Sequence, residues 1–222
     1  MGKNSELYIA PSILAADFGH LTDSIKQIES VSDYLHIDVM DGHYVPNISI
    51  GVPVIQSIRS QTSLPFDVHL MITNPLAFIV PFAEAGADLI SFHIETVDDP
   101  LEVINRIHAS GKRAGIAIHP DTDMEDAFPY LHAVDLVLVM SVRPGFGGQK
   151  FMNEAISRIA SVRERLDSCN ETALLSVDGG INEMTAPLVT QAGANHLVMG
   201  NSVFGAEDPV EAIRRTRSCV TL

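Results

Sequence analysis

The sequence predicts an α/β protein, a (β/α)₈ barrel that forms a single domain over residues 1–222. Short apolar runs alternate with helical stretches along the whole chain. Eight such pairs fit into 222 residues, a length that suits one barrel of this type. No linker, low-complexity tract or change in composition interrupts the series, so we expect no second domain.

The expected strands are the apolar runs, which differ from the helical stretches in length and spacing. They are Leu7–Leu14, Tyr34–Met40, Phe66–Met71, Leu89–His93, Ala114–His119, Leu136–Ser141, Leu174–Val177 and His196–Met199. The expected helices are residues 18–31, 51–60, 76–85, 100–110, 123–130, 152–168, 184–192 and 208–217.

Capping residues mark several of these boundaries. Asp99–Pro100 and Asp208–Pro209 each place a capping carboxylate before a proline in the first helical turn. Gly86 and Gly193 each follow a helix and precede a strand. The alternative fold is a doubly wound open sheet. The glycine fingerprint that usually follows its first strand is replaced here by residues 11–14, so we favour the barrel.

Composition excludes several classes of partner. The formal net charge is −14, which argues against nucleic acid and anionic membranes because both need a basic surface. A small anionic substrate remains open, because backbone N–H groups can bind it locally. The polar start Met1–Glu6 does not resemble a signal peptide, and no apolar run reaches the ~20 residues of a membrane span. We therefore expect a cytoplasmic protein.

Polar side chains gather where the expected strands end. In a barrel these carboxyl ends meet at one rim, which is where barrel enzymes place their chemistry. The residues concerned are Ser12, His36, Asp38, Asp67, His69, His93, Glu95, His119, Ser141 and Asp178. Any one of them could be a satisfied buried polar residue, but their convergence on one rim indicates a site.

Four of these residues suit a metal ion. On a strand, His36 and Asp38 share one face, and burying both is costly unless something pairs with them. With His69 and Asp178 they supply two nitrogen and two oxygen donors. This donor set suits Zn²⁺, Fe²⁺, Mn²⁺ or Co²⁺. Ligand type alone does not rank these four ions; we expect one divalent ion and take Zn²⁺ as the first candidate.

Three glycine-containing loops follow the last three strands. They cover residues 143–149, 178–180 and 200–201. Glycine lets backbone N–H groups approach an anion closely, and barrels often bind phosphate with the loops after strands seven and eight. Each loop alone could be a tight turn, but three neighbouring loops favour a phosphate site held mainly by backbone N–H groups, since Arg143 is one of few basic residues nearby.

Several long motifs in order resemble the ribulose-phosphate 3-epimerase family. They are residues 11–17, residues 36–47, Asp67–Met71, Met140–Gln149 and Val177–Gly180. The resemblance runs essentially from end to end. It implies a (β/α)₈ barrel that interconverts D-ribulose 5-phosphate and D-xylulose 5-phosphate in the pentose phosphate pathway, and relatives that are commonly dimers or hexamers. We therefore expect a homo-oligomer and a small ketose phosphate as the substrate.

The same resemblance implies roles for individual residues. A divalent metal would be held by His36, Asp38, His69 and Asp178. Asp38 and Asp178 would also be the acid/base pair, moving one proton at C3 through an enediolate. The residues implied to contact the substrate are Ser12, His69, Gly145, Phe146, Gly147, Gly148, Gly179, Gly180, Gly200 and Asn201. Those implied to cap the site are Met40, Met71 and Met140.

Four positions depart from the family's commonest pattern: Arg143, His119, Met199 and Asn201. Arg143 and Met199 are expected to border the pocket, which leaves the choice of ketose phosphate open. The alternatives are a 3-epimerase of a related sugar such as allulose 6-phosphate, and a non-catalytic sugar-phosphate-binding barrel. A hexulose-phosphate synthase is disfavoured, because Asp38 is not followed by a lysine in an Asp-x-Lys pattern.

Overall fold

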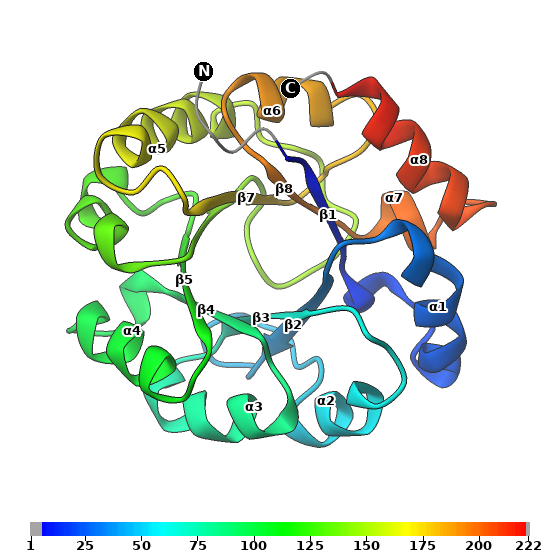
Figure 1. The fold of residues 1–222 in the computed structure, drawn as a ribbon, viewed down its shortest axis with the longest axis horizontal. Helices are drawn as coiled ribbons and strands as arrows, with labels where there is room; N and C mark the ends of the chain where they lie inside the picture. Colours follow the sequence, from blue (N-terminus) through cyan, green and yellow to red (C-terminus); the bar gives the residue numbers. More distant parts are fainter. Residues whose placement is uncertain (1–5, 221–222) are drawn as a thin grey trace.

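The computed structural model describes residues 6–220, so most of the polar N-terminal stretch lies outside the described residues. Eight parallel strands form one sheet in the order β1-β8-β7-β6-β5-β4-β3-β2. Figure 1 shows the strands as an inner ring surrounded by helices. The strands are β1 Tyr8–Pro11, β2 Leu35–Met40, β3 Phe66–Met71, β4 Leu89–His93, β5 Arg113–Ile118, β6 Leu136–Met140, β7 Leu174–Asp178 and β8 His196–Met199. The predicted barrel is confirmed.

The seam between β1 and β2 completes the ring. These two strands do not form a regular ladder, but Ser12 and His36 make an isolated parallel bridge just beyond β1. The N–H groups of Asp33 and Tyr34 also donate to the Ile9 carbonyl oxygen. The seam therefore brings the polar end of β1 beside the first histidine of β2.

The α-helices lie outside the strands and cover them (Figure 1). They are α1 Leu21–Ile28, α2 Val52–Arg59, α3 Ile79–Ala85, α4 Pro100–Ala109, α5 Ala155–Cys169, α6 Ala186–Gln191, α7 Asn201–Phe204 and α8 Pro209–Cys219. The expected caps are present: the side chain of Asp99 accepts from the first turn of α4, and Asp208 accepts from Glu211 N of α8. Among the described residues, no helix is long and apolar enough to cross a membrane.

The predicted helix at residues 123–130 is wrong. This connection contains two 3₁₀ segments, Met124–Asp126 and Phe128–Ala133. Pro129 lacks the N–H group that an α-helical i→i−4 hydrogen bond needs, so the segment does not continue as an α-helix. The short helix α7, which follows β8, was not predicted.

Alternate residues of each strand pack into two different hydrophobic cores. The outward-facing set, such as Ile37 and Val39 of β2, packs against the helices in the large core. The inward-facing set fills the barrel with a smaller cluster that includes Leu138 and Met140 of β6. On β2 and β3 the inward positions carry histidine and aspartate instead, which places their polar side chains inside the barrel near its carboxyl rim.

Candidate active site and metal centre

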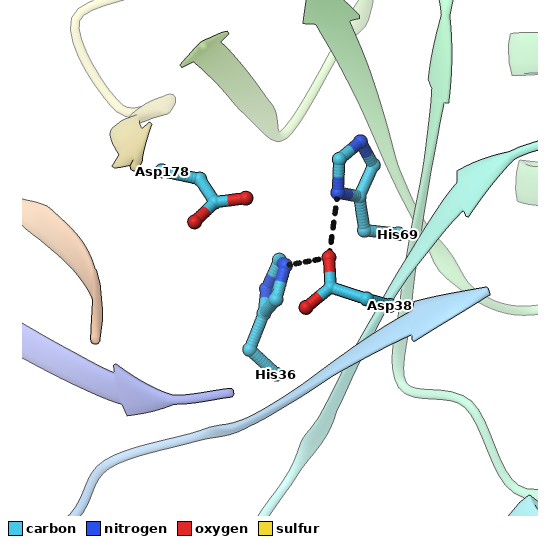
Figure 2. Close-up of side chains that lie close together, drawn as sticks. All are labelled: His36, Asp38, His69 and Asp178. Carbon is cyan, nitrogen blue, oxygen red and sulfur yellow. Dashed lines mark hydrogen bonds and ion pairs between the residues drawn. The ribbon is translucent and has the colours of Figure 1, made fainter. Parts of the chain in front are cut away.

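The four predicted metal ligands come together. One donor atom from each of His36, Asp38, His69 and Asp178 lies within 4.8 Å of all the others. β2 supplies the first two, and β3 and β7 supply His69 and Asp178. Figure 2 shows the carboxylates of Asp38 and Asp178 approaching one another from opposite sides, with both imidazole rings beside Asp38. This cluster could hold a metal ion.

Asp38 is the centre of the local contacts (Figure 2). Its Oδ1 lies 3.3 Å from His36 Nε2 and 3.2 Å from His69 Nδ1. The hydroxyl of Ser12 donates to Asp38 Oδ2 at 2.5 Å. Both histidines are fully buried, and Asp38 is almost so. Concentrating this many polar groups in the barrel interior is costly unless each is paired, so a shared cation fits the arrangement.

The orientation of His36 also fits a metal ion. Its Nδ1 lies 2.7 Å from the buried carboxylate of Asp67, which can only accept a hydrogen bond and therefore fixes a proton on Nδ1. Its Nε2 is buried and makes no well-directed hydrogen bond to any described residue. A carboxylate behind the ring and an Nε2 atom without a hydrogen-bond partner in front are typical of a metal-ligating histidine.

The two facing carboxylates have pKa values displaced in opposite directions. Burial raises the pKa of Asp178, and the negative charge of Asp38 raises it further, to about 6. Burial acts in the same sense on Asp38, but the neighbouring imidazoles, His36 above all and then His69, outweigh it and lower its pKa below the usual range. Opposed environments for two carboxyl groups are the pattern of an acid/base pair.

Metal binding should release about one proton at pH 7. Burial acts to lower the pKa of His36, but Asp38 and Asp67 outweigh it and hold this pKa well above the usual value of histidine. The ring is therefore protonated in the metal-free protein, whereas a ligating imidazole must be neutral. Affinity should accordingly rise with pH.

Calorimetric titration of the protein with Zn²⁺, in buffers of different ionisation enthalpy, measures this proton. The Asp67→Asn variant removes one of the two carboxylates that raise the pKa of His36, so it should release fewer protons. Binding of Zn²⁺ at pH 7 with no proton release by the unaltered protein would contradict the assignment.

A cavity of about 410 Å³ opens above the cluster. Its lining includes the predicted acid/base pair, Asp38 and Asp178, and every residue predicted to contact the substrate or cap the site except His69. These are Ser12, Met40, Met71, Met140, Gly145, Phe146, Gly147, Gly148, Gly179, Gly180, Gly200 and Asn201. His36 and His69 do not line it, and both are fully buried. Cavity and metal cluster therefore share Asp38 and Asp178.

The glycine loops pack closely against one another at one end of this cavity. Gly180 has φ +66°, and a Cβ atom there would lie 2.6 Å from the backbone nitrogen of Phe151. A Cβ atom on Gly148 would lie 2.6 Å from Nδ2 of Asn201. No lysine or arginine is among the described residues that line the cavity. An anion at this end would depend on backbone N–H groups.

Two loops meet beside the cavity. Asn47, in the loop after β2, donates from Nδ2 to the carbonyl oxygen of Gly145 at 2.9 Å, in the loop after β6. Met40, Met71 and Val45 form a small apolar cluster beside it. These contacts connect the predicted methionine cap to the glycine loop. The sequence reading gave no role to Asn47, although it lies inside the 36–47 motif.

Of the four positions that depart from the family pattern, only Asn201 lines the cavity. Arg143 turns outward and makes a two-point ion pair with Asp121. Met199 is buried in the core between strands and helices. The expectation that Arg143 and Met199 border the pocket is therefore wrong. Successive strand residues point to opposite faces. Val198 faces inward, so the next residue, Met199, must face the helices.

Sequence reasoning also left several contacting residues without a role. Those that line the cavity are Leu14, Ala15, Val142, Pro144, Gln149, Ile181, Asn182, Val198 and Ser202. Most of them continue the same loops or flank predicted residues, so extending each motif by two or three positions would have found them. The residues behind the metal cluster, Asp67 and His93, were noted only as polar residues of the rim.

Comparison with known proteins agrees with this architecture. A model of the "Ribulose-phosphate 3 epimerase family" matches residues 8–204. A ribulose-phosphate 3-epimerase of Mycobacterium tuberculosis is 46% identical over 216 residues, covering 97% of this chain and 94% of that protein. The cytoplasmic isoform of the same enzyme in Oryza sativa is 45% identical over 217 residues, covering 96% and 93%. These two relatives span nearly the whole chain.

A solved structure of 3-hexulose-6-phosphate synthase superposes with a TM-score of 0.74. It is 18% identical and covers 97% of this chain and all of that one. Identity this low shows a shared barrel fold and carries nothing about activity.

Proposed function

This chain belongs to the ribulose-phosphate 3-epimerase family, and we propose that it interconverts D-ribulose 5-phosphate and D-xylulose 5-phosphate by moving a proton at C3. It is an isomerase that acts on carbohydrates. The observation that carries the proposed mechanism is the pair of carboxylates, Asp38 and Asp178, facing one another above the cavity floor with opposed pKa values. The proposed catalytic domain is the whole chain, residues 1–222.

The proton transfer needs one base and one acid on opposite faces of the sugar. The C3 proton is acidic because C3 adjoins the C2 ketone. One carboxylate removes it, the C–H electron pair forms a C2–C3 double bond, and the ketone oxygen gains negative charge to give an enediolate. The other group, protonated beforehand, returns a proton to C3 from the opposite face. The two groups end with their protonation states exchanged, ready for the reverse reaction.

Asp38 and Asp178 suit these two roles. A pKa of about 6 lets Asp178 carry or give up a proton near neutral pH. Asp38 has its pKa lowered by its histidine neighbours, His36 above all, and its carboxylate accepts from the hydroxyl of Ser12. We propose His36, Asp38, His69 and Asp178 as ligands of one divalent ion, Zn²⁺ ahead of Fe²⁺, Mn²⁺ and Co²⁺. When bound, this ion supplies a Lewis acid that favours negative charge on the substrate oxygens.

The rest of the cavity would hold and cover the substrate. We propose that backbone N–H groups of Gly145–Gly148, Gly179–Gly180 and Gly200–Asn201 bind the phosphate, since the lining offers it no cationic side chain. Met40, Met71 and Met140 would cover the reacting carbons. A dry cover limits loss of the enediolate to side reactions such as elimination of phosphate.

We further propose a cytoplasmic location and a homo-oligomer, either a dimer or a hexamer. Support for the location is the name of the rice relative, a cytoplasmic isoform. The acidic surface, with a net charge of −14, supports neither nucleic acid nor an anionic membrane as a partner.

The activity and its dependence on metal can be tested together. D-ribulose 5-phosphate in D₂O should exchange its C3 hydrogen and form D-xylulose 5-phosphate, both followed by NMR. A strong chelator, removed again by dialysis, should lower both rates by at least ~10²-fold, and added Zn²⁺ should restore them. A parallel assay with D-allulose 6-phosphate distinguishes an epimerase of pentulose phosphates from an epimerase of hexulose phosphates.

Tight binding of the sugar phosphate without C3 exchange would instead indicate a non-catalytic barrel. Full turnover after verified removal of metal would contradict the metal-assisted mechanism.

A further inference from the structure

A chain of polar contacts leads away from the metal cluster behind His69. His69 Nε2 lies 3.0 Å from Nε2 of His93, the last residue of β4. His93 Nδ1 lies 2.8 Å from Oε1 of Glu95, and the hydroxyl of Tyr44 donates to the same oxygen at 2.5 Å. His93, Glu95 and Tyr44 do not line the cavity, although Tyr44 packs against the apolar cluster of Met40, Val45 and Met71 beside it.

These contacts fix where the protons lie. A carboxylate accepts only, so Glu95 holds a proton on His93 Nδ1. In a neutral His93 ring, Nε2 is then a bare acceptor. The short distance between the two Nε2 atoms requires one of them to donate, so His69 must carry its proton on Nε2. This leaves the lone pair of His69 on Nδ1, which lies 3.2 Å from Asp38 Oδ1, so a cation shared by these two acceptor atoms would satisfy both.

The rings themselves are packed so that this arrangement is held. The ring centroids of His69 and His93 are 5.0 Å apart, and those of His93 and Tyr44 are 4.7 Å apart. His69 and His93 are fully buried, whereas the Glu95 side chain is 26% exposed. Tyr44 lies in the loop after β2, the loop that also carries Asn47. The series therefore runs from a buried histidine to a partly exposed carboxylate at the rim of the barrel.

We propose that His93, Glu95 and Tyr44 are positioning residues that hold His69 with its Nδ1 lone pair directed at the metal ion. The role parallels that of Asp67 behind His36, with one difference: a second imidazole stands between the ligand and its carboxylate. Carboxylates behind a ligating imidazole set its tautomer and raise its basicity. This inference rests on the metal site proposed above.

The test compares metal affinity in Glu95→Gln, His93→Phe and Tyr44→Phe with that of the unaltered chain. Affinity for Zn²⁺ is measured by competition with a chromogenic chelator. We expect His93→Phe and Glu95→Gln to bind Zn²⁺ about 10- to 100-fold more weakly, and Tyr44→Phe to show a smaller loss. The KM for D-ribulose 5-phosphate at saturating Zn²⁺ should stay within a factor of about three, because none of these residues lines the cavity.

A spectrum gives a second readout that mere loss of stability would not change. In the Co²⁺-loaded protein, the visible absorption bands should shift in Glu95→Gln, because the basicity of one ligand changes. The matched control is His108→Gln: His108 lies on α4 and pairs with Asp135 on the outside of the barrel. Its affinity and spectrum should equal those of the unaltered chain.

The outcomes separate the two proposals. If the unaltered chain binds neither Zn²⁺ nor Co²⁺, the proposed metal site fails. If it binds both and Glu95→Gln and Tyr44→Phe bind them equally well with unshifted spectra, the positioning role alone is overturned. These two variants decide the matter even if His93→Phe does not fold, because their side chains are not fully buried.

Discussion

The Asp38→Asn and Asp178→Asn variants should each lose ~10²- to 10⁴-fold in epimerisation rate, the range typical for removal of a general acid or base. Asparagine keeps nearly the same shape but cannot take up a proton. Asp38 and Asp178 are the two carboxylates of the metal cluster, and the pKa of each is displaced. Either loss should therefore stop inversion in both directions.

Isotope exchange gives this prediction a sharper form. In Asp178→Asn, the remaining Asp38 can still remove a C3 proton and return one to the same face. One of the two epimers should then exchange its C3 hydrogen with D₂O without inversion, while the other should not. Asp38→Asn should show the opposite preference.

Both residues are also proposed metal ligands, so the metal content of each variant must be measured and restored with excess Zn²⁺ before rates are compared. Asp121→Asn is a suitable control: this exposed carboxylate near the same rim pairs with Arg143 outside the cavity. Its rate should change by less than about threefold. If either cluster variant kept near-normal turnover, or if both exchanged the same epimer, the two-base assignment would be wrong.

The strands could be predicted closely because each is an apolar run ended by a polar or glycine-rich turn. Three predicted strands match the structure at both ends: Phe66–Met71, Leu89–His93 and His196–Met199. β1 ends earlier than predicted, because the Ser12 side chain accepts from Leu14 N and starts a 3₁₀ turn. That contact depends on side-chain geometry, which strand propensity does not contain.

The metal cluster could be predicted from residue type, strand parity and family motif together. Parity alone places His36 and Asp38 on one face of β2, but it does not bring Asp178 of β7 opposite them. Closure of the barrel does that. The contact between His69 and His93 could not be predicted from the sequence, because it depends on the register of β3 against β4. In that register His69 pairs with Ser91. Arg143 was misjudged for a similar reason: its partner Asp121 comes from a different loop.

The Gly180→Ala variant should raise the KM for D-ribulose 5-phosphate by at least ~10-fold and lower stability by about 1–3 kcal/mol. The added Cβ would lie 2.6 Å from the backbone nitrogen of Phe151 and 2.9 Å from its Cα. Backbone cannot rotate aside as a side chain can, so the loop after β7 or the loop after β6 must shift. Both loops supply the N–H groups proposed to bind phosphate.

Gly111→Ala isolates the cost of backbone conformation from that of the clash. Gly111 has φ +73°, close to the +66° of Gly180, but no atom lies within 4 Å of its added Cβ. It follows α4, at the end of the barrel where β5 begins. This control should lose about 1–2 kcal/mol of stability for the left-handed conformation, with KM unchanged.

Competitive inhibition by inorganic phosphate then assigns the effect to the anion site. If the glycine loops hold the phosphate, the inhibition constant of phosphate should rise in Gly180→Ala by a factor similar to that of KM, and should not change in Gly111→Ala. A raised KM with an unchanged inhibition constant of phosphate would indicate that the variant binds the sugar, and not the phosphate, more weakly. An unchanged KM would show that these loops do not bind the phosphate, which would then need a cationic partner that the described cavity lining does not offer.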